Sequence, residues 1–385
     1  MKKIPFAKPI INEQDIKLIN KVIKSGILTH GPIGLKFEEQ FSKFTNLKYC
    51  LSTTSCTSSL LMAYKLIDLK KNDEFIVPAQ THVATVNAGI FLGAKPVFVD
   101  SDLDTGNLDL EKIEEKITKK TKCITIVHFL GKPVDIKKIL WLKRKYKIKI
   151  IEDCALALGS KYYGKHVGYY ADFACFSFYP AKHITTGDGG MLTCLNKNDY
   201  KKAKLLRGFG VNKTFFERKI PGIYDVLSAG INFRLSDINS ALGLTQLRKL
   251  KYIIHKREKN YKRLYQSLKN FNNLKILNTS TVKNLKSSYY CLSFIIKNIS
   301  RTQRNLYLTY LSDLGVGCTV HYPRAIMDYK YSKKDRENKN QFLNARKISN
   351  NSINIPVGPH LNDLNIKYII KILTKLFNWL IKMFF

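Results

Sequence analysis

The chain has 385 residues, 45% of them hydrophobic, and carries a formal net charge of +36 at pH 7. This length and composition exclude a mainly disordered protein, and they predict one large core together with a smaller one. The basic residues are scattered from Lys2 to Lys382 without a helix-turn-helix, zinc-finger or RNA-binding signature, so we expect no nucleic-acid partner. Attraction of anionic substrates is the milder consequence of the charge.

The cysteines and the two termini indicate the compartment. The eight cysteines form no Cys-x-x-Cys pair, which argues against zinc and against a disulfide framework, so we expect no metal. The amino terminus has no apolar signal core, and no uninterrupted apolar stretch reaches membrane-spanning length. We therefore expect a cytoplasmic protein without membrane insertion, in which the last segment, 368–385, is a packing helix.

From about residue 48 to 194, short apolar runs alternate with helical stretches, a pattern typical of βαβ units in a largely parallel sheet. The predicted strands are 75–77, 96–99, 123–129, 148–152 and 174–178, and the predicted helices are 57–69, 110–117 and 136–146. After Gly230 the pattern predicts a long amphipathic helical stretch over 236–269, a strand over 289–296, a helix over 301–314 and a surface loop over 330–340.

The predicted fold class is α/β, with a large domain and a smaller one. The large domain, 13–245, has a mostly parallel mixed sheet flanked by helices. The smaller C-terminal domain, 246–385, is α+β, and residues 1–12 pack near it. Ligand sites in such sheets collect at the carboxyl ends of the strands.

Lys182 lies between a run of strand formers, 174–178, and a glycine-rich turn, 185–190. A lysine at such an edge loses hydration, which lowers its pKa and favours Schiff-base chemistry. The alternative is a solvent-facing charge, as for most lysines of this chain.

Three other segments could meet Lys182 at the same edge of the sheet. Asp153 ends a predicted strand and could pair with a protonated ring nitrogen, or simply cap a helix. The hydroxyl-rich segment 53–59 could hold a phosphate at a helix N-terminus, or be an ordinary Ser/Thr cap. His82 follows a strand and could lie flat on an aromatic cofactor, or be a structural hydrogen-bonding residue.

Together, these residues resemble the DegT/DnrJ-type nucleotide-sugar aminotransferases, a branch of the aspartate-aminotransferase-like fold (pyridoxal-phosphate transferase fold type I). The resemblance runs nearly end to end. Its marks are in segments 4–7, 25–32, 37–39, 77–87, 93–100, 104–107, 127–131, 152–153, 176–190, 230–234 and 320–323. Each segment is weak alone, but their order and spacing are specific.

The resemblance implies a role for each matching residue. Lys182 would bond to pyridoxal 5'-phosphate and shuttle a proton, and Asp153 would hold the protonated ring. Cys56, Thr57 and Ser177 would bind the phosphate, and His82 occupies the position of the ring-stacking aromatic. Asn232, with Arg234 close by, would reach the cofactor of the neighbouring subunit, which implies a homodimer with shared active sites. The candidate substrate contacts are Gly31, Pro32, His183, His321 and Tyr322.

Two positions decide how far the resemblance extends. Relatives carry His or Gln three residues after the acid, where this chain has Leu156, so the contact to the ring hydroxyl is lost or comes from elsewhere. An offshoot of the family that removes a sugar hydroxyl has His in place of the lysine, whereas Lys182 is intact here.

We expect an aminotransferase that converts a nucleotide-linked keto-sugar to an amino sugar, with L-glutamate as donor, for a surface polysaccharide or glycoconjugate. The segment Lys182-His-Ile-Thr-Thr186 resembles that of 4-keto-6-deoxy-sugar enzymes. The alternatives are a dehydratase with the same cofactor, and a non-catalytic regulatory or binding protein on the same fold.

Overall fold

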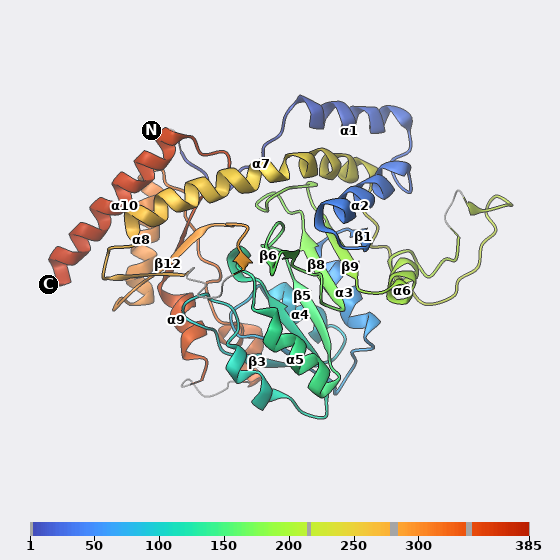
Figure 1. Ribbon diagram of the computed structural model, residues 1–385, viewed down its shortest axis with the longest axis horizontal. Helices are drawn as coiled ribbons and strands as arrows, with labels where there is room; N and C mark the ends of the chain where they lie inside the picture. Colours follow the sequence, from blue (N-terminus) through green and yellow to red (C-terminus); the bar gives the residue numbers. More distant parts are fainter. Residues whose placement is uncertain (1–2, 214–216, 278–283, 336–340, 385) are drawn as a thin grey trace.

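The computed structural model describes residues 3–213, 217–277, 284–335 and 341–384 (Figure 1). Its large sheet has seven strands in the order β1-β9-β8-β5-β4-β2-β3. Only β9 runs antiparallel to its neighbours, so the predicted mostly parallel mixed sheet is confirmed. The strands are β1 (Tyr49–Thr53), β2 (Glu74–Pro78), β3 (Lys95–Val99), β4 (Thr121–Val127), β5 (Lys149–Asp153), β8 (Phe173–Ser177) and β9 (Gly190–Cys194).

Helices cover both faces of this sheet, because successive strand residues point to opposite sides. On β5, Ile150 belongs to one hydrophobic cluster and Ile151 to another. The first cluster includes residues of α2 (Pro32–Thr45), α5 (Ile136–Tyr146) and α7 (Asp237–Leu268). The second includes residues of α3 (Cys56–Leu66), α4 (Val83–Ile90) and α6 (Lys197–Arg207). The sheet is therefore buried between two helical layers, with α1 (Glu13–Ser25) packed against α7.

A smaller antiparallel sheet follows in the order β10-β12-β13, with strands β10 (Leu274–Leu277), β12 (Leu292–Ile296) and β13 (Ser352–Ile355). Helices α8 (Arg301–Asp313), α9 (Leu343–Asn351) and α10 (Asp363–Phe384) accompany it. Near the amino terminus, Ile4 pairs with Val316 and is buried in the same core. A third, very short sheet contains β6 (Lys161–Tyr162), β7 (Lys165–His166) and β11 (Leu285–Lys286).

Helix α7 joins the two cores, as the long diagonal helix in Figure 1 shows. Its residues up to Ile253 pack in the core of the large sheet, and those from Tyr261 onward pack in the core of the small one. The predicted domain division at 245 and 246 lies inside this unbroken helix, so it stays a prediction about folding units.

Four predicted elements differ from the structure. The predicted helix over 110–117 is wrong: the segment forms two 3-10 turns, η1 (Leu110–Lys112) and η2 (Glu114–Lys116), because so short a charged segment with one fully buried side chain, Ile113, does not sustain an α-helix. The predicted strand over 289–296 starts later, at Leu292, since Tyr289 has a left-handed φ of 54°.

The strand predicted over 123–129 ends earlier, because η3 (Phe129–Gly131) turns the chain. In the predicted loop over 330–340, the first part forms the 3-10 helix η6 (Lys330–Asp335), and 336–340 lie outside the described residues.

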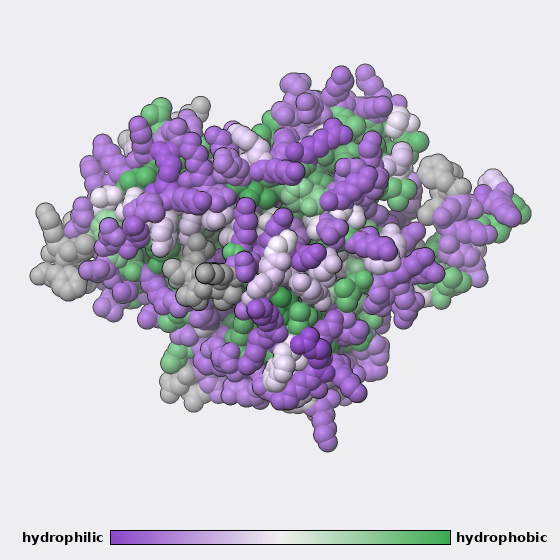
Figure 2. Space-filling view, viewed as in Figure 1, coloured by the Kyte–Doolittle hydropathy of each residue, from purple (hydrophilic) through white to green (hydrophobic). Residues whose placement is uncertain are grey.

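Helix α10 packs its apolar side on the small sheet through Ile366, Ile369, Leu373, Leu376 and Phe377, as expected of a packing helix. Within the described ranges, we find no helix whose length and hydropathy would let it cross a bilayer. Figure 2 shows hydrophilic residues over most of the visible face instead of over one element, in keeping with the scattered charges of the sequence.

Lys132 is a buried amine that joins the loop after β3 to the small sheet. Its Nζ donates hydrogen bonds to the carbonyls of Thr105 (2.6 Å) and Leu277 (2.8 Å), and burial lowers its pKa to about 7. A lysine in the unfolded chain titrates near about 10.4, so the folded state binds this proton less tightly. The buried amine therefore lowers the free energy of unfolding by its full amount below about pH 7. This loss fades as the pH rises from there toward the lysine pKa of the unfolded chain.

We therefore expect Lys132→Met to change how stability depends on pH. The free energy of unfolding of the wild type minus that of the variant should rise between pH 7 and 10 by about 1 kcal/mol per pH unit. Urea unfolding at several pH values measures this difference. Lys197→Met, at an exposed position of α6, is the matched control and should give a flat difference. A flat difference for Lys132→Met as well would contradict the prediction.

Candidate active site

Lys182 lies in the loop between β8 and β9, and hydrogen bonds close that loop at its base. The amide of Phe178 donates to the Gly189 carbonyl (2.9 Å), and the amide of Thr186 donates to the Phe178 carbonyl (3.0 Å). At Gly190 an added Cβ would lie 2.5 Å from the carbonyl carbon of Ser55, so only glycine lets β9 approach the start of α3 this closely. The loop therefore holds Lys182 beside the N-terminus of α3.

The amine of Lys182 lies in a poorly hydrated place. Burial lowers its pKa, while the nearby Cys56 thiol and Asp153 carboxyl raise it and offset part of this effect. Its Nζ lies 5.7 Å from the centroid of the Tyr290 ring. The structure therefore brings Lys182, Asp153 and Cys56 together, and it gives the amine the lowered pKa that a nucleophilic lysine needs.

Asp153 is the last residue of β5 and is only 5% exposed. The hydroxyl of Thr85 donates to its Oδ2 (2.7 Å), and the amide of Ala155 donates to its Oδ1 (3.0 Å). The Thr85 hydroxyl also lies 3.0 Å from that of Thr81. These bonds fix the carboxylate at the carboxyl edge of the sheet, where it can bind a protonated ring nitrogen.

The N-terminus of α3 offers a site for a phosphate. Ser55 caps the helix: its side chain accepts from the amide of Ser58 and its carbonyl accepts from the amide of Ser59. These caps leave the first-turn amides of Cys56 and Thr57 for another acceptor, and the helix dipole favours an anion there. Ser177 ends β8, next to β9, and is 9% exposed. The predicted phosphate residues thus lie on neighbouring elements.

His82 and Tyr322 are in ring contact on the same side of the sheet. His82 caps α4, accepting at Nδ1 from the amide of Ala84 (3.2 Å), and its ring is 5.3 Å from that of Tyr322. The side-chain amide of Gln80 donates to the carbonyls of His321 (3.0 Å) and Tyr322 (3.3 Å). Burial, helped by the charges of Lys182 and His82, lowers the pKa of His321 to about 3, so this ring is neutral.

His183, the residue after Lys182 in the chain, is buried and packs beside Tyr290. It is 4% exposed, and its Nε2 lies 3.0 Å from the carbonyl oxygen of Ser288, to which it can only donate. Its ring contacts that of Tyr290 at 5.9 Å. This position favours a supporting role for His183. Its predicted contact with the substrate stays a prediction.

The remaining predicted site residues lie at the start of α2 and in the segment that precedes α7. Gly31 and Pro32 begin α2, where a Cβ on Gly31 would meet the Asp237 carboxylate at 2.0 Å. Asn232 pairs with Gly208, and Arg234 pairs with Thr53 just before α3. Arg234 lines a cavity of about 750 Å³ to which Lys182, Asp153 and Cys56 do not contribute.

Leu156 packs in a hydrophobic cluster with Phe129, Leu130 and Tyr290 and is 3% exposed. Its side chain offers no hydrogen bond, and its carbonyl accepts from the Ser288 hydroxyl (3.1 Å). Leu156 therefore places an apolar side chain at the position where the family resemblance implies a polar contact to the ring hydroxyl of the cofactor.

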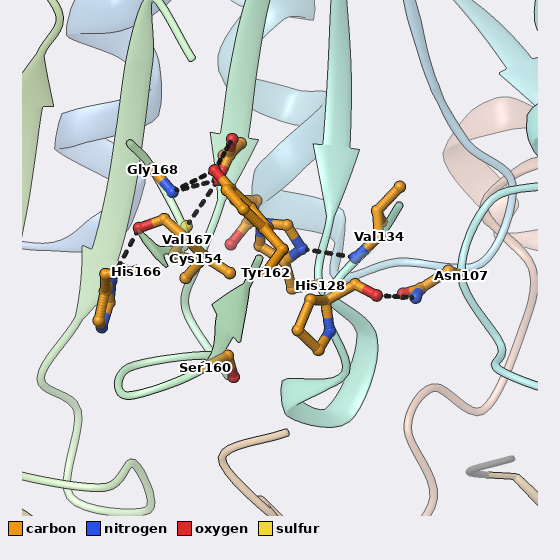
Figure 3. A network of polar contacts seen from close by, with 12 residues as sticks. Asn107, His128, Val134, Cys154, Ser160, Tyr162, His166, Val167 and Gly168 are labelled. Carbon is orange, nitrogen blue, oxygen red and sulfur yellow. Dashed lines mark hydrogen bonds and ion pairs between the residues drawn. The ribbon is translucent and has the colours of Figure 1, made fainter. Parts of the chain in front are cut away.

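A buried hydrogen-bond network that includes His128, Tyr162 and Gly168 (Figure 3) meets at Glu152, the residue before Asp153. The carboxylate of Glu152 accepts from the Tyr162 hydroxyl (2.9 Å), from the amide of Gly168 and from Nε2 of His128 (2.9 Å). The atoms of His128, Glu152 and Cys154 lie close enough to hold a metal ion. However, Nδ1 of His128 accepts from the amide of Val134 (3.0 Å), so the ring proton is on Nε2 and points at Glu152. We interpret the group as a structural network that fixes the end of β5.

Sequence reasoning missed Thr85, Gln80 and Tyr290. Thr85 lies one helical turn after Thr81, a spacing that could have suggested a shared acceptor. Gln80 and Tyr290 have no local signal, because their contacts join residues more than 100 positions apart in the chain.

Comparison with known proteins shows the family. The model of the DegT/DnrJ/EryC1/StrS aminotransferase family matches residues 9–374. The GDP-perosamine synthase of Escherichia coli O157:H7 is 33% identical over 374 residues, covering 96% of this chain and 97% of the relative. The UDP-4-amino-4,6-dideoxy-N-acetyl-beta-L-altrosamine transaminase of Campylobacter jejuni is 33% identical over 373 residues, covering 95% of each.

Solved structures agree with these matches. PseC of Helicobacter pylori, an aminotransferase involved in the biosynthesis of pseudoaminic acid, superposes with a TM-score of 0.91 at 31% identity, over 98% of this chain and all of that one. The sugar aminotransferase Spr1654 of Streptococcus pneumoniae, in its PLP form, gives a TM-score of 0.90 at 27% identity, over 98% and 99% of the two chains. The predicted fold and resemblance are confirmed, and the chain belongs to the DegT/DnrJ/EryC1/StrS aminotransferase family.

Proposed function

We propose that this aminotransferase uses pyridoxal 5'-phosphate to move an amino group from an amino acid, with L-glutamate as the expected donor, to a keto-sugar linked to a nucleoside diphosphate. The observation that carries the proposal is the meeting of Lys182, Asp153 and the N-terminus of α3 at one edge of the large sheet. An amine, a carboxylate and an anion site are the three groups that this cofactor requires.

The residues fit the cofactor. Asp153, held by Thr85 and Ala155, would bind the ring nitrogen, and Cys56, Thr57 and Ser177 would bind the phosphate. When bound, pyridoxal phosphate supplies an electron-withdrawing ring that stabilises charge at the carbon that loses its proton.

The chain itself would move and direct the proton. Lys182, with its lowered pKa, would take a proton from the donor carbon and deliver it to the adjoining carbon of the cofactor. The neutral ring of His321 would act as a hydrogen-bonding group for the sugar, and the Tyr322 ring beside it, against His82, would exclude water from the reacting centre.

The relatives support a nucleotide-linked 4-ketosugar as substrate. The names of the Escherichia coli and Campylobacter jejuni relatives describe enzymes of amino sugars carried by GDP or UDP. The segment 182–186 carries the pattern expected of 4-keto-6-deoxy-sugar enzymes. Use of the product in a surface polysaccharide or glycoconjugate and a cytoplasmic location remain predictions; the relative named for spore coat polysaccharide biosynthesis in Bacillus subtilis supports the first.

We also propose that the protein is a homodimer. The segment after α6 projects away from the body (Figure 1), and its large apolar side chains Ile220, Ile223 and Leu227 are 60–63% exposed. Such a patch on a projecting arm indicates a surface that another chain covers. Asn232 lies at the base of this arm with Arg234 close by, and from there Asn232 would reach the partner's cofactor.

Incubation with L-glutamate and a panel of nucleotide-linked 3-keto and 4-keto sugars tests the function. We expect one 4-keto substrate to gain an amino group, seen by mass spectrometry and by conversion of glutamate to 2-oxoglutarate. Loss of a sugar hydroxyl without gain of nitrogen would identify the dehydratase alternative instead. If no keto-sugar gains nitrogen although the cofactor is bound, the proposal is wrong.

A further inference from the structure

The aromatic ring of Tyr290 lies against the amine of Lys182, although the two residues belong to different parts of the fold. Lys182 is in the loop after β8 of the large sheet, and Tyr290 is two residues before β12 of the small sheet. The Nζ atom lies 5.7 Å from the ring centroid, within the range of a cation held by an aromatic face. Tyr290 is 4% exposed, so water does not weaken this contact.

Three distant segments hold the Tyr290 ring in place. Arg257 of α7 donates to the carbonyl of Tyr290 (2.7 Å), and its guanidinium carbon lies 5.9 Å from the centroid of the same ring, so this ring contacts two cations. The ring of His321 packs against it edge-on at 5.4 Å, and the ring of Phe6 does so at 6.3 Å. Because these contacts come from α7, the segment after α8 and the N-terminal segment, the ring has little freedom to move.

Few of the other ionisable groups near the Lys182 amine favour its protonated form. Burial lowers its pKa, and the groups that oppose this effect are Cys56 of α3 and Asp153 of β5. The remaining titratable neighbours are His82, His183 and His321; burial lowers the pKa of each, so they are neutral near pH 7. The Tyr290 ring is therefore a further contact, besides Cys56 and Asp153, that favours an ammonium at this place.

We propose that Tyr290 is a positioning residue that seats the ammonium form of Lys182 whenever this side chain is not bonded to the cofactor. The proposal rests on the function proposed above. In that function the Lys182 amine would accept one proton from the donor carbon and later deliver the same proton to the adjoining carbon of the cofactor, so nothing is consumed. Between these two transfers the ring would stabilise the ammonium form of Lys182 and keep Nζ beside the reacting carbons.

The test measures the Lys182 amine without sugar or amino acid. Full-length protein freed of cofactor is mixed with pyridoxal at a series of pH values, the product is reduced with borohydride, and label on Lys182 is quantified by peptide mass spectrometry. The rate follows the neutral fraction of the amine. For Tyr290→Met we expect the profile to move to lower pH by about half to one and a half units. Tyr290→Phe keeps the ring and should retain the wild-type profile.

A second series guards against misfolding of the methionine variant. Phenylalanines carrying one, two or three ring fluorines, introduced at position 290, keep the shape and progressively weaken the negative face of the ring. We expect a graded shift to lower pH along this series. The proposal is overturned if the series and Tyr290→Met both keep the wild-type profile, or if Tyr290→Phe shifts as far as Tyr290→Met. Because no sugar nucleotide is used, a negative substrate panel would not alter this result.

Discussion

Lys182→Ala should reduce amino transfer by at least about 10⁴-fold, because it removes both the covalent attachment and the group that moves the proton. The loop around it should survive, since its hydrogen bonds join the backbones of Phe178, Thr186 and Gly189 and involve no atom of the Lys182 side chain. Burial of the amine lowers its pKa, so its removal should leave stability unchanged or slightly increased. The measurement is the rate of amino-sugar formation with L-glutamate, together with thermal unfolding.

Lys197→Ala, on the exposed face of α6, is the matched control and should keep full activity. Borohydride reduction of the wild-type protein loaded with cofactor should place a pyridoxyl group on the peptide that contains Lys182. Wild-type turnover by Lys182→Ala, or a label found on another lysine alone, would refute the assignment.

The parts of the site predicted from the sequence depend on local signals. The acid at 153 directly follows an apolar strand, and the lysine at 182 lies between strand formers and glycines. Carboxyl ends of neighbouring parallel strands meet at one edge, so these residues had to lie near each other once β5 and β8 paired. The alternation of short apolar runs with helical stretches predicted the largely parallel sheet, and the amphipathic pattern over 236–269 predicted helical structure where α7 lies.

The parts that could not be predicted depend on contacts between distant segments. Tyr290 reaches Lys182 only because the small sheet packs against the loop after β8, and no spacing in the sequence encodes that approach. The strand after it, β12, begins later than predicted because one residue, Tyr289, takes a left-handed conformation. The stretch 110–117 has helical spacing, but its shortness left it as two 3-10 turns.

The alternation of β5 explains how the fold supports its site. Glu152 and Asp153 are neighbours on one strand, so their side chains point to opposite faces of the sheet. Asp153 faces Thr85 on the α4 side, whereas Glu152 faces the network of His128 and Tyr162. The network therefore fixes the backbone from which Asp153 projects.

Glu152→Ala should lower the free energy of unfolding by about 3–5 kcal/mol, since it leaves several buried donors without their acceptor. The Tyr162 hydroxyl, the Gly168 amide and the His128 ring all donate to this carboxylate, and Glu152 is fully buried. Because Asp153 is the next residue, the variant should also bind pyridoxal phosphate more weakly. Urea unfolding without cofactor and a titration with cofactor measure the two effects separately.

Glu115→Ala removes a carboxylate that is 63% exposed in a surface pair with Lys116, and it should change stability by no more than about 0.5 kcal/mol. Glu152→Gln keeps the size of the side chain, but its amide hydrogens oppose donors, so we expect a loss closer to that of alanine than to the wild type. If both variants at Glu152 unfold like the wild type, the network does not stabilise β5. Unchanged affinity for the cofactor in a destabilised variant would show instead that Asp153 is held by Thr85 and Ala155 alone.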